Sequence, residues 1–316
     1  MVHRLSERSE RSSILPRLLG GRPSSSRMSD GRPSVKRQRM ISKNDGKVED
    51  IEIGLLLEGI YLRYGYDFRD YAPASLRRRI RKSMQDEKIG TVSGFQERIL
   101  HDPSCMKRLL LTISIDVTSM FRDPGFYLAI RKKVVPHLRN HSLLRIWHAG
   151  CSTGEEVYSM AILLLEEGLY DKTRIYATDL NGVILEKAKN GIFPLTSMKE
   201  YTDNYLKAGG TGSFSEYYTA RYENALFKSG LKRNIVWAEH NLVTDGSFNE
   251  FNIIFCRNVM IYFNKSLQDR VHKLLYESMV ISGFLGLGSK ESIRFTPFEG
   301  CYEEVNSREK LYRKTK

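Results

Sequence analysis

The stretch "LLRIWHAGCSTGEEVYSMAILLLEE", residues 143–167, decides the fold of this chain. It begins as an apolar run typical of a buried strand, turns at Gly150 and Gly154, and continues with the apolar spacing of a helix. A glycine turn between a strand and a helix commonly holds a ligand at the helix N-terminus. The question is which ligand accepts the two carboxylates, Glu155 and Glu156, at this entrance.

Three further segments of the C-terminal part have the pattern of short strands. They are residues 173–179, 234–241 and 251–258, and helical patterns lie between most of them. Alternating strands and helices predict a doubly wound, mostly parallel sheet, an α/β fold of the Rossmann-like type. Two late segments, 283–289 and 309–316, are expected to complete the sheet as antiparallel strands.

Composition and periodicity divide the chain into parts. Residues 1–47 are rich in Ser, Gly, Pro and Arg and are expected to be a disordered basic tail, with a transit peptide as the alternative. Residues 48–125 have helical apolar spacing and predict a small N-terminal all-α domain. Residues 126–316 predict the α/β domain, interrupted at about 195–238 by a segment rich in Tyr, Phe and Gly that predicts an inserted, small antiparallel β-subdomain.

Charge and cysteine content exclude several classes of function. The net charge is +13, but residues 1–47 hold twelve Lys or Arg against four acids, which leaves only +5 for the rest, so we expect no nucleic-acid partner. The four cysteines form no CxxC pair, so neither a disulfide framework nor a metal site is indicated, and a cytoplasmic location is expected. No apolar run approaches the roughly 18 residues of a membrane span, so membrane insertion is not expected.

The predicted strands end in polar residues. In an open α/β sheet the ligand binds beyond the carboxyl ends of the strands, so the glycine turn, Asp179, Asn241 and the run Cys256–Asn258 predict one site. Asp179 ends the second strand, where an acid accepts hydrogen bonds from a ribose diol. The alternative is that Asp179 caps the N-terminus of the helix that follows.

The glycine turn argues against a dinucleotide. The fingerprint GxGxxG is absent, and Glu155 and Glu156 occupy the helix entrance that would have to bind a pyrophosphate. A ligand with adenosine and cationic groups but no phosphate is favoured there. S-adenosylmethionine (SAM) has these properties, whereas the alternative is that the two acids only complement the helix dipole.

Five runs in this order resemble the chemotaxis receptor methyltransferases, the CheR family, which methylate glutamates of chemoreceptors. The resemblance covers about residues 48–316, and the runs are "IDVTSMFRDP" (115–124), "GCSTGEEVYSMA" (150–161), "YATDLNGVILEKAKNGIF" (176–193), "EHNLV" (239–243) and "FCRNVMIYFN" (255–264). It implies a class I SAM-dependent methyltransferase domain that acts as a protein-glutamate O-methyltransferase in chemotaxis signal transduction, with S-adenosylhomocysteine as product.

The resemblance also implies roles for particular residues. Arg122 and Tyr262 correspond to residues at the reacting groups. Together with the glycine turn, the cofactor-binding set is expected to be Asp116, Thr118, Arg122, Gly150, Glu155, Glu156, Asp179, Asn241, Leu242, Cys256 and Arg257. Asp116 departs from the family pattern, because many relatives carry Asn there, and Asp keeps the acceptor but lacks the amide donor.

The implied partner is the cytoplasmic helical bundle of a chemoreceptor. The basic run Arg77–Lys82 is interpreted as steering toward that acidic bundle, with a solvated face and a phosphate grip as alternatives. The β-subdomain could add a receptor tail peptide as a further strand. Two other functions stay open from the residues alone, a methyltransferase acting on RNA or a small molecule and a non-catalytic module that senses SAM. Cys256 is interpreted as a buried cysteine rather than as the nucleophile of an RNA methyltransferase.

Overall fold

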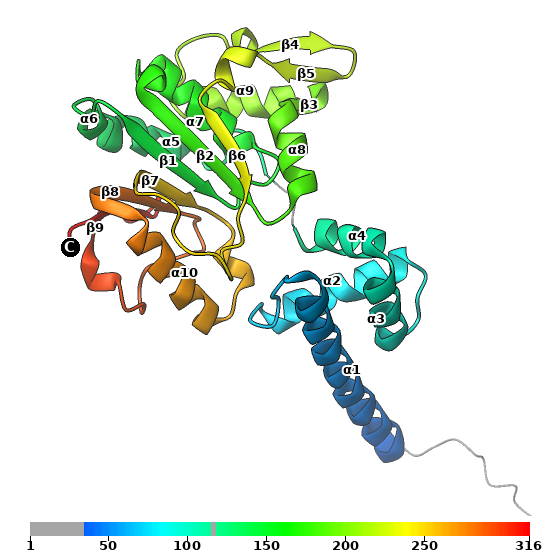
Figure 1. Ribbon diagram of the computed structural model, residues 1–316. Helices are drawn as coiled ribbons and strands as arrows, with labels where there is room; N and C mark the ends of the chain where they lie inside the picture. The colour runs from blue at the N-terminus through cyan, green and yellow to red at the C-terminus, as the bar shows by residue number, and fades with distance from the viewer. Residues whose placement is uncertain (1–34, 115–117) are drawn as a thin grey trace, which may run out of the picture. The chain divides into compact units, whose positions relative to one another are not determined.

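The computed structural model describes residues 35–114 and 118–316, and side chains from Gly46 onward. Asp116, expected in the ligand site, lies outside the described residues. One compact unit extends over Val48–Lys316. It contains the helical part and the sheet that the sequence predicts (Figure 1).

Four helices form the N-terminal helical part within the described residues. They are α1 (Val35–Tyr64), α2 (Pro73–Asp86), α3 (Val92–His101) and α4 (Pro103–Ile113). Local sequence sets their starts: the side chain of Thr91 accepts the Gly94 amide at the start of α3, and that of Asp102 accepts the Ser104 amide at the start of α4. Among the described helices, none is long and apolar enough to cross a bilayer.

The sheet has seven strands in the order β6-β2-β1-β7-β8-β10-β9. The strands are β1 (Leu144–Ala149), β2 (Thr173–Asp179), β6 (Ile235–Glu239), β7 (Phe251–Cys256), β8 (Met279–Leu287), β9 (Tyr302–Asn306) and β10 (Leu311–Lys314). The α-helices of this part are α5 (Pro124–Ala129), α6 (Val135–Leu138), α7 (Glu155–Glu166), α8 (Gly182–Asn190), α9 (Met198–Lys207) and α10 (Lys265–Glu277). Short π- or 3-10-helical segments are η1 (Ile130–Val134), η2 (Tyr170–Lys172), η3 (Leu195–Ser197), η4 (Phe214–Tyr217), η5 (Ser229–Leu231), η6 (Met260–Tyr262) and η7 (Glu299–Cys301).

The prediction of a mostly parallel, doubly wound sheet is confirmed, with one error in strand direction. β2, β1, β7 and β6 are parallel as expected, but β8 is also parallel to β7 and not antiparallel. The reason is that α10 returns the chain to the starting edge of the sheet before β8 begins, which is what a parallel crossover requires. β10 is antiparallel to β8 as expected, and its partner β9 was not predicted.

The inserted β-subdomain is a separate three-stranded antiparallel sheet in the order β3-β5-β4. Its strands are β3 (Ile192–Pro194), β4 (Tyr218–Arg221) and β5 (Asn224–Phe227), so it begins slightly before the expected insertion. Helix α9 lies between β3 and β4 in the chain (Figure 1).

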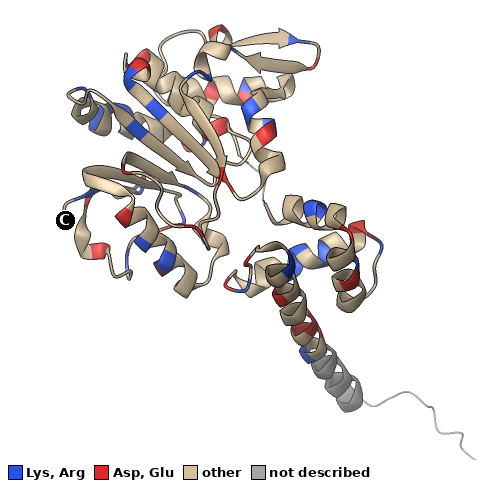
Figure 2. Cartoon of the chain, viewed as in Figure 1, with Lys and Arg blue, Asp and Glu red and all other residues tan. Residues whose placement is uncertain are grey.

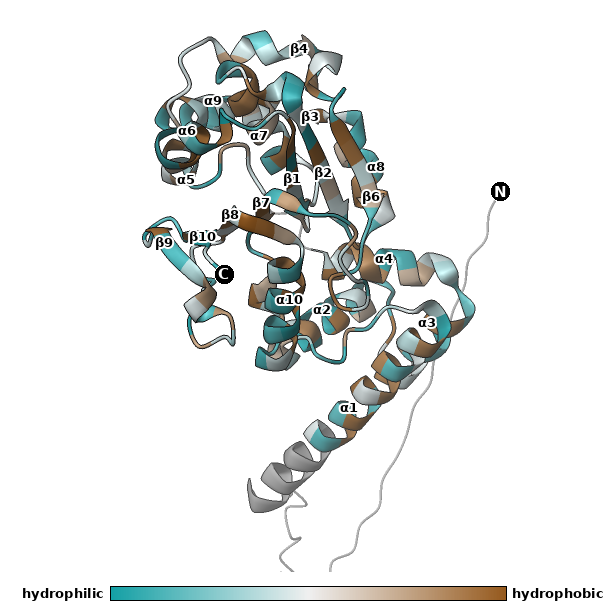
Figure 3. Cartoon of the chain, turned by 60° about the vertical axis from the view of Figure 1, so that its left-hand side comes forward, coloured by the Kyte–Doolittle hydropathy of each residue, from teal (hydrophilic) through white to brown (hydrophobic). Residues whose placement is uncertain are grey.

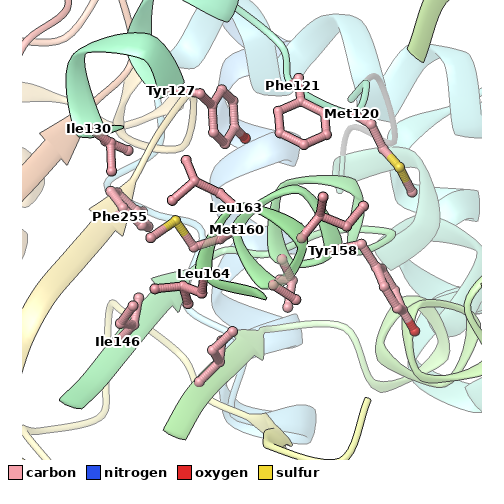
Figure 4. Close-up of a cluster of buried hydrophobic side chains, with 14 of the residues drawn as sticks. Met120, Phe121, Tyr127, Ile130, Ile146, Tyr158, Met160, Leu163, Leu164 and Phe255 are labelled. Atoms are coloured by element: carbon pink, nitrogen blue, oxygen red, sulfur yellow. The ribbon is translucent and has the colours of Figure 1, made fainter. Parts of the chain in front are cut away.

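Alternate residues of the central strands pack on opposite faces of the sheet, as the two-residue period of a strand requires. Ile146 and Phe255 belong to the core that α7 and α5 complete, and Leu163 and Tyr127 are members of the same buried cluster (Figure 4). Trp147 and its strand neighbours on the other face share a core with α10 and with the helices α1 to α4. The hydropathy colouring shows apolar residues along these strands (Figure 3). The helical part and the sheet are therefore parts of one packed body.

Candidate active site

A cavity of about 340 Å³ lies at the carboxyl ends of β1, β2, β6 and β7. It is the place that the strand-end residues predict. Most of the predicted site residues line it, namely Thr118, Arg122, Gly150, Glu156, Asp179, Asn241, Leu242, Arg257 and Tyr262. The helical part contributes Tyr71, Ile113 and Ser114, which the sequence did not indicate.

The turn after β1 has positive φ angles at its two glycines, as its residue types suggest. Gly150 has φ +78°, and a Cβ at this position would lie 2.6 Å from Cγ2 of Val259. A larger residue would therefore be strained and would also collide with the loop after β7. Gly154, with φ +93°, precedes the first turn of α7, in which Glu155 and Glu156 stand.

Glu156 is held from two sides at the cavity. Its carboxylate lies 2.9 Å from Nδ1 of His148 and accepts a bond of 2.9 Å from Nη1 of Arg257. Burial alone would raise the pKa of Glu156, but His148 and Arg257 together hold this pKa below its ordinary value. The cavity therefore presents a fixed negative charge at the helix entrance.

Arg257 joins the glycine turn to the segment before α5. Its guanidinium forms a second ion pair with Asp123, at 2.7 Å, and lies 4.0 Å from the ring centroid of Phe126. Burial opposes the charge of Arg257, yet the carboxylates of Glu156 and Asp123 keep its pKa above the usual range. The Arg257 side chain is 3% exposed and that of Glu156 19%, so water screens this pair little, whereas Asp123, at 41% exposed, is screened more.

Asp179 lies at the end of β2 and lines the cavity. Its carboxylate accepts the backbone amides of Ser152 at 2.9 Å and of Asn181 at 3.1 Å. Helix α8 is capped by Asn181, whose side chain accepts the Val183 amide, and not by Asp179. The capping alternative for Asp179 is thereby excluded, because another residue has that role.

Two predicted residues do not line the cavity. Glu155 is buried and directed elsewhere: its carboxylate accepts bonds from the hydroxyls of Thr153 at 2.6 Å and Tyr201 at 3.4 Å. Cys256 is fully buried in the core at the end of β7, and burial raises the pKa of its thiol. A buried thiol with a raised pKa is a poor nucleophile, in agreement with its interpretation as a core residue.

The loop after β7, residues 257–263 (hereafter the strand-end loop), meets the helical part. The Ala72 amide donates to the Tyr262 carbonyl at 2.8 Å, and Tyr71 forms an isolated antiparallel bridge with Phe263. The buried guanidinium of Arg79 lies 4.3 Å from the ring centroid of Tyr262. Tyr262, predicted near the reacting groups, lies in η6 of the strand-end loop and is contacted there by Arg79 of α2.

Several residues of the site were missed in the sequence. His148 stands inside a strand, and a polar residue just before a glycine turn was the available signal. Asp123 precedes Pro124, which suggests only a helix start. Arg79 and Tyr71 gave no signal, because their relation to the site depends on packing between distant segments.

Residues 116–309 match the family model described as the CheR methyltransferase SAM-binding domain, and residues 51–114 match its all-alpha domain. A Pseudomonas putida protein that carries the name methyltransferase Cher3 is 52% identical, over 84% of this chain and 97% of its own. The chemotaxis protein methyltransferase of Listeria monocytogenes is 29% identical, over 72% of this chain and 85% of its own. Among solved structures, the N-methyltransferase NodS of Bradyrhizobium japonicum covers 63% of this chain and is itself covered to 90%, with a TM-score of 0.35 and 12% identity, a likeness too weak to bear on function.

Proposed function

The chain belongs to the CheR methyltransferase family, and we propose that it transfers the methyl group of SAM to glutamate carboxylates of chemoreceptors. The observation that carries the proposal is the anionic strand-end cavity, in which Glu156 is kept ionised by His148 and Arg257 while Asp179 stands at the end of β2. A glutamate acceptor fits the chain's place among chemotaxis methyltransferases, and we propose the cytoplasm as the site of action.

The residues at the cavity fit this cofactor. SAM carries a sulfonium and an ammonium group, which the carboxylate of Glu156 complements. Asp179 is in the position of a ribose-binding acid, and Leu242 and Val243 give an apolar surface suited to an adenine ring. When bound, the cofactor supplies an electrophilic methyl group.

The acceptor needs little activation. A glutamate side chain has a pKa of about 4.3 and is already an anion at pH 7, so no general base is required. The protein then has to align the carboxylate with the methyl group, a role in which positioning can contribute roughly 7 kcal/mol or more. We assign this alignment to Arg122, as the cation that orients a carboxylate, and to Tyr262, as a hydrogen-bond donor.

These two roles predict distinct losses. Arg122→Ala and Tyr262→Phe should each lower kcat by about 10- to 100-fold at saturating SAM, because each removes one group that orients the reacting atoms. The measurement is single-turnover methyl transfer to receptor membranes. If both variants turned over at the native rate, neither residue would have the role assigned to it.

Helix α2 is proposed as the receptor-docking surface. Figure 2 shows its positive charges, but they are not equivalent. Arg77 pairs with Asp50 and Arg81 with Glu49 of α1, and Arg79 is buried. Arg78 and Lys82 are exposed and form no ion pair with any described residue. We therefore assign attraction of an acidic helical bundle to Arg78 and Lys82, a narrower set than the whole basic run.

The β-subdomain is proposed as a second, optional contact. β4 is an edge strand of its sheet and most of it is exposed, so an extended receptor tail could add beside it through backbone hydrogen bonds. Fluorescence anisotropy with a labelled receptor tail peptide tests this contact. Absence of binding would leave α2 as the docking surface and remove the tether.

One assay distinguishes the proposed function from its alternatives. Purified protein is given methyl-labelled SAM together with receptor-containing membranes and, separately, with RNA. Label on the receptor that is released by mild base as methanol indicates a carboxyl methyl ester and supports the proposal. Base-stable label on RNA would replace it with an RNA methyltransferase, and binding of SAM without any transfer would indicate a sensor module.

A further inference from the structure

Behind the strand-end loop lies a carboxylate that neither the family resemblance nor the cavity includes. Glu291 follows β8 in the chain and is 6% exposed. β8 is the parallel neighbour of β7, and Leu287 is paired with Cys256, so the segments that leave these two strand ends begin side by side. Glu291 is thus positioned to contact the strand-end loop, and it is not one of the residues that line the cavity.

The carboxylate of Glu291 is bound by four backbone amides. Oε1 accepts the amides of Val259 at 2.9 Å and Met260 at 2.8 Å, and Oε2 accepts those of Asn258 at 2.8 Å and Gly288 at 2.7 Å. Both oxygens are therefore fully engaged. A carboxylate with four backbone donors is unsuited to proton transfer with a substrate. Its role is therefore expected to be structural, namely to hold the backbone segments that donate these bonds.

Three of these amides come from consecutive residues. Asn258 has φ +61°, in the left-handed region, and Val259 has φ −107° and ψ −54°. This alternation turns successive N–H groups toward one point and forms a concave anion site of the kind called a nest. In this protein the nest is filled by the chain's own Glu291 and not by a group of the ligand. Burial raises the pKa of this carboxyl, and the four amide donors oppose that shift by favouring the ionised form.

Gly288 gives independent support for the same arrangement. A Cβ at this position would lie 2.7 Å from Oε2 of Glu291 and 2.8 Å from the backbone nitrogen of Asn258. Contacts of this length do not occur for real Cβ atoms, so the approach of the two segments depends on a residue without a side chain.

The strand-end loop supplies a whole side of the cavity. Arg257, Asn258, Val259 and Tyr262 line it, and three of the four residues that bind Glu291 lie between Arg257 and Tyr262 in the chain. We propose that Glu291 is a positioning residue, an internal anion whose four amide bonds fix the strand-end loop so that Arg257 and Tyr262 face the cavity in their binding geometry. This inference rests on the proposed function in one respect, because that function identifies SAM as the ligand of the cavity.

The test is Glu291→Gln with Glu299→Gln as matched control. Glutamine keeps the shape but replaces one oxygen by an NH₂ group, which cannot accept the bonds that two backbone amides donate. Glu299 lies in the same segment, is exposed, and accepts one backbone amide, that of Phe295, at 2.9 Å. Calorimetric titration with SAM should give a Kd raised about tenfold for Glu291→Gln and changed by less than about twofold for Glu299→Gln. A native Kd in Glu291→Gln, or an equal loss in both variants, would overturn the proposal.

A second variant and a second readout separate positioning from misfolding. Gly288→Ala leaves Glu291 in place but forces the two segments apart, so its Kd for SAM should rise as well, and this variant decides the test if Glu291→Gln does not fold. The second readout is turnover with receptor as the methyl acceptor. The kcat, calculated per SAM-binding site, should fall, while the KM for receptor should stay native because α2 is unchanged. If kcat per SAM-binding site were native and only the activity per milligram of protein fell, the variant would simply contain less folded protein, and this result would contradict the proposal. The Kd readout does not depend on the methyl acceptor, so failure of the proposed function would be recognised separately, by a native protein that binds SAM but leaves receptors unlabelled.

Discussion

The cavity has two walls, and they are held by different interactions. The strand-end wall carries a charged network, in which Arg257 bridges Glu156 and Asp123 and the loop is bound to Glu291. The helical wall consists of side chains from the helical part. It is linked to Tyr262 by the buried guanidinium of Arg79, which lies over the ring, and by the hydrogen bond from the Ala72 amide to the Tyr262 carbonyl.

This difference indicates a division of work. The strand-end wall lies at one edge of the sheet, and its carboxylates are held in place by Arg257 and by backbone amides, so it can receive a cofactor without rearranging. The helical wall connects the proposed docking helix α2 to Tyr262, so a receptor bound at α2 would lie next to the residue assigned to methyl transfer. Mutations of the first wall should therefore affect stability and SAM binding, and those of the second wall should affect turnover and receptor affinity.

The largest effect is expected for Arg257→Met. Methionine keeps the packing on Phe126 but leaves two carboxylates, Glu156 and Asp123, near each other without their cation. Breaking a buried ion pair in this way costs about 3–5 kcal/mol of unfolding free energy. Urea denaturation measures the loss, and SAM binding should become undetectable by calorimetry.

The control for this variant is Arg233→Met, which removes an ion pair with Asp171 in which both side chains are more than half exposed. An exposed pair contributes about 1 kcal/mol or less. Equal losses in the two variants would contradict the view that burial gives the Arg257 network its strength.

Glu156→Gln should have a smaller effect that depends on pH. Loss of the charge-assisted bonds to Arg257 and His148 should cost about 1–3 kcal/mol near neutrality. The folded-state pKa of Glu156 lies below its ordinary value, so its contribution is present above the unfolded pKa and is lost as pH falls through the folded pKa.

The difference in unfolding free energy between native protein and Glu156→Gln should therefore shrink as pH is lowered from about 5 toward about 3. Urea titrations of both proteins across this range provide the measurement. A difference that stays constant to the lowest pH at which the native protein folds would mean that the charge of Glu156 is not what stabilises the wall.

Arg79→Met tests whether the helical wall acts on turnover and not on SAM binding. The variant keeps an apolar stem but removes the cation over Tyr262 and the 2.8 Å bond to the Ile113 carbonyl. A desolvated cation–π contact is worth up to about 2 kcal/mol, so kcat should fall about tenfold, with the Kd for SAM close to native. Arg77→Met, on the same helix and paired with Asp50, is the control and should keep native kcat. A larger change in SAM affinity than in kcat would place Arg79 with the strand-end wall instead.

The two walls also differ in how far the sequence predicts them. Gly150, Glu156 and Asp179 were predicted because the carboxyl ends of parallel strands meet at one edge of a sheet, so local strand and helix patterns suffice. Their placement needs no knowledge of side-chain packing. The same rule predicted Asn241, whereas Leu242 was expected at the cavity from the family resemblance.

The helical wall was not predictable in this way. Arg79 stands in a run of basic residues, and its burial follows from sharing a helix face with Leu76 and Ile80, which only the packing of α2 reveals. Glu291 lies about thirty residues beyond the loop it binds, and no local pattern marks it. The direction of β8 was predicted wrongly because glycine-rich strands of this length give no signal of orientation, which the crossover through α10 decides.

The smallest effect is expected at the outer surface of the helical wall, where receptor docking can be separated from catalysis. Arg78→Glu with Lys82→Glu reverses two exposed charges that form no ion pair with a described residue. KM for receptor should rise by about three- to tenfold at low salt, since exposed charges act mainly by steering, and the gap from native protein should narrow as salt is raised. The Kd for SAM and the kcat at saturating receptor should stay native, because neither side chain reaches the cavity. Equal loss of SAM affinity would mean that the two walls are not independent, and a salt-independent rise in KM would point to a shape change in α2 rather than to lost attraction.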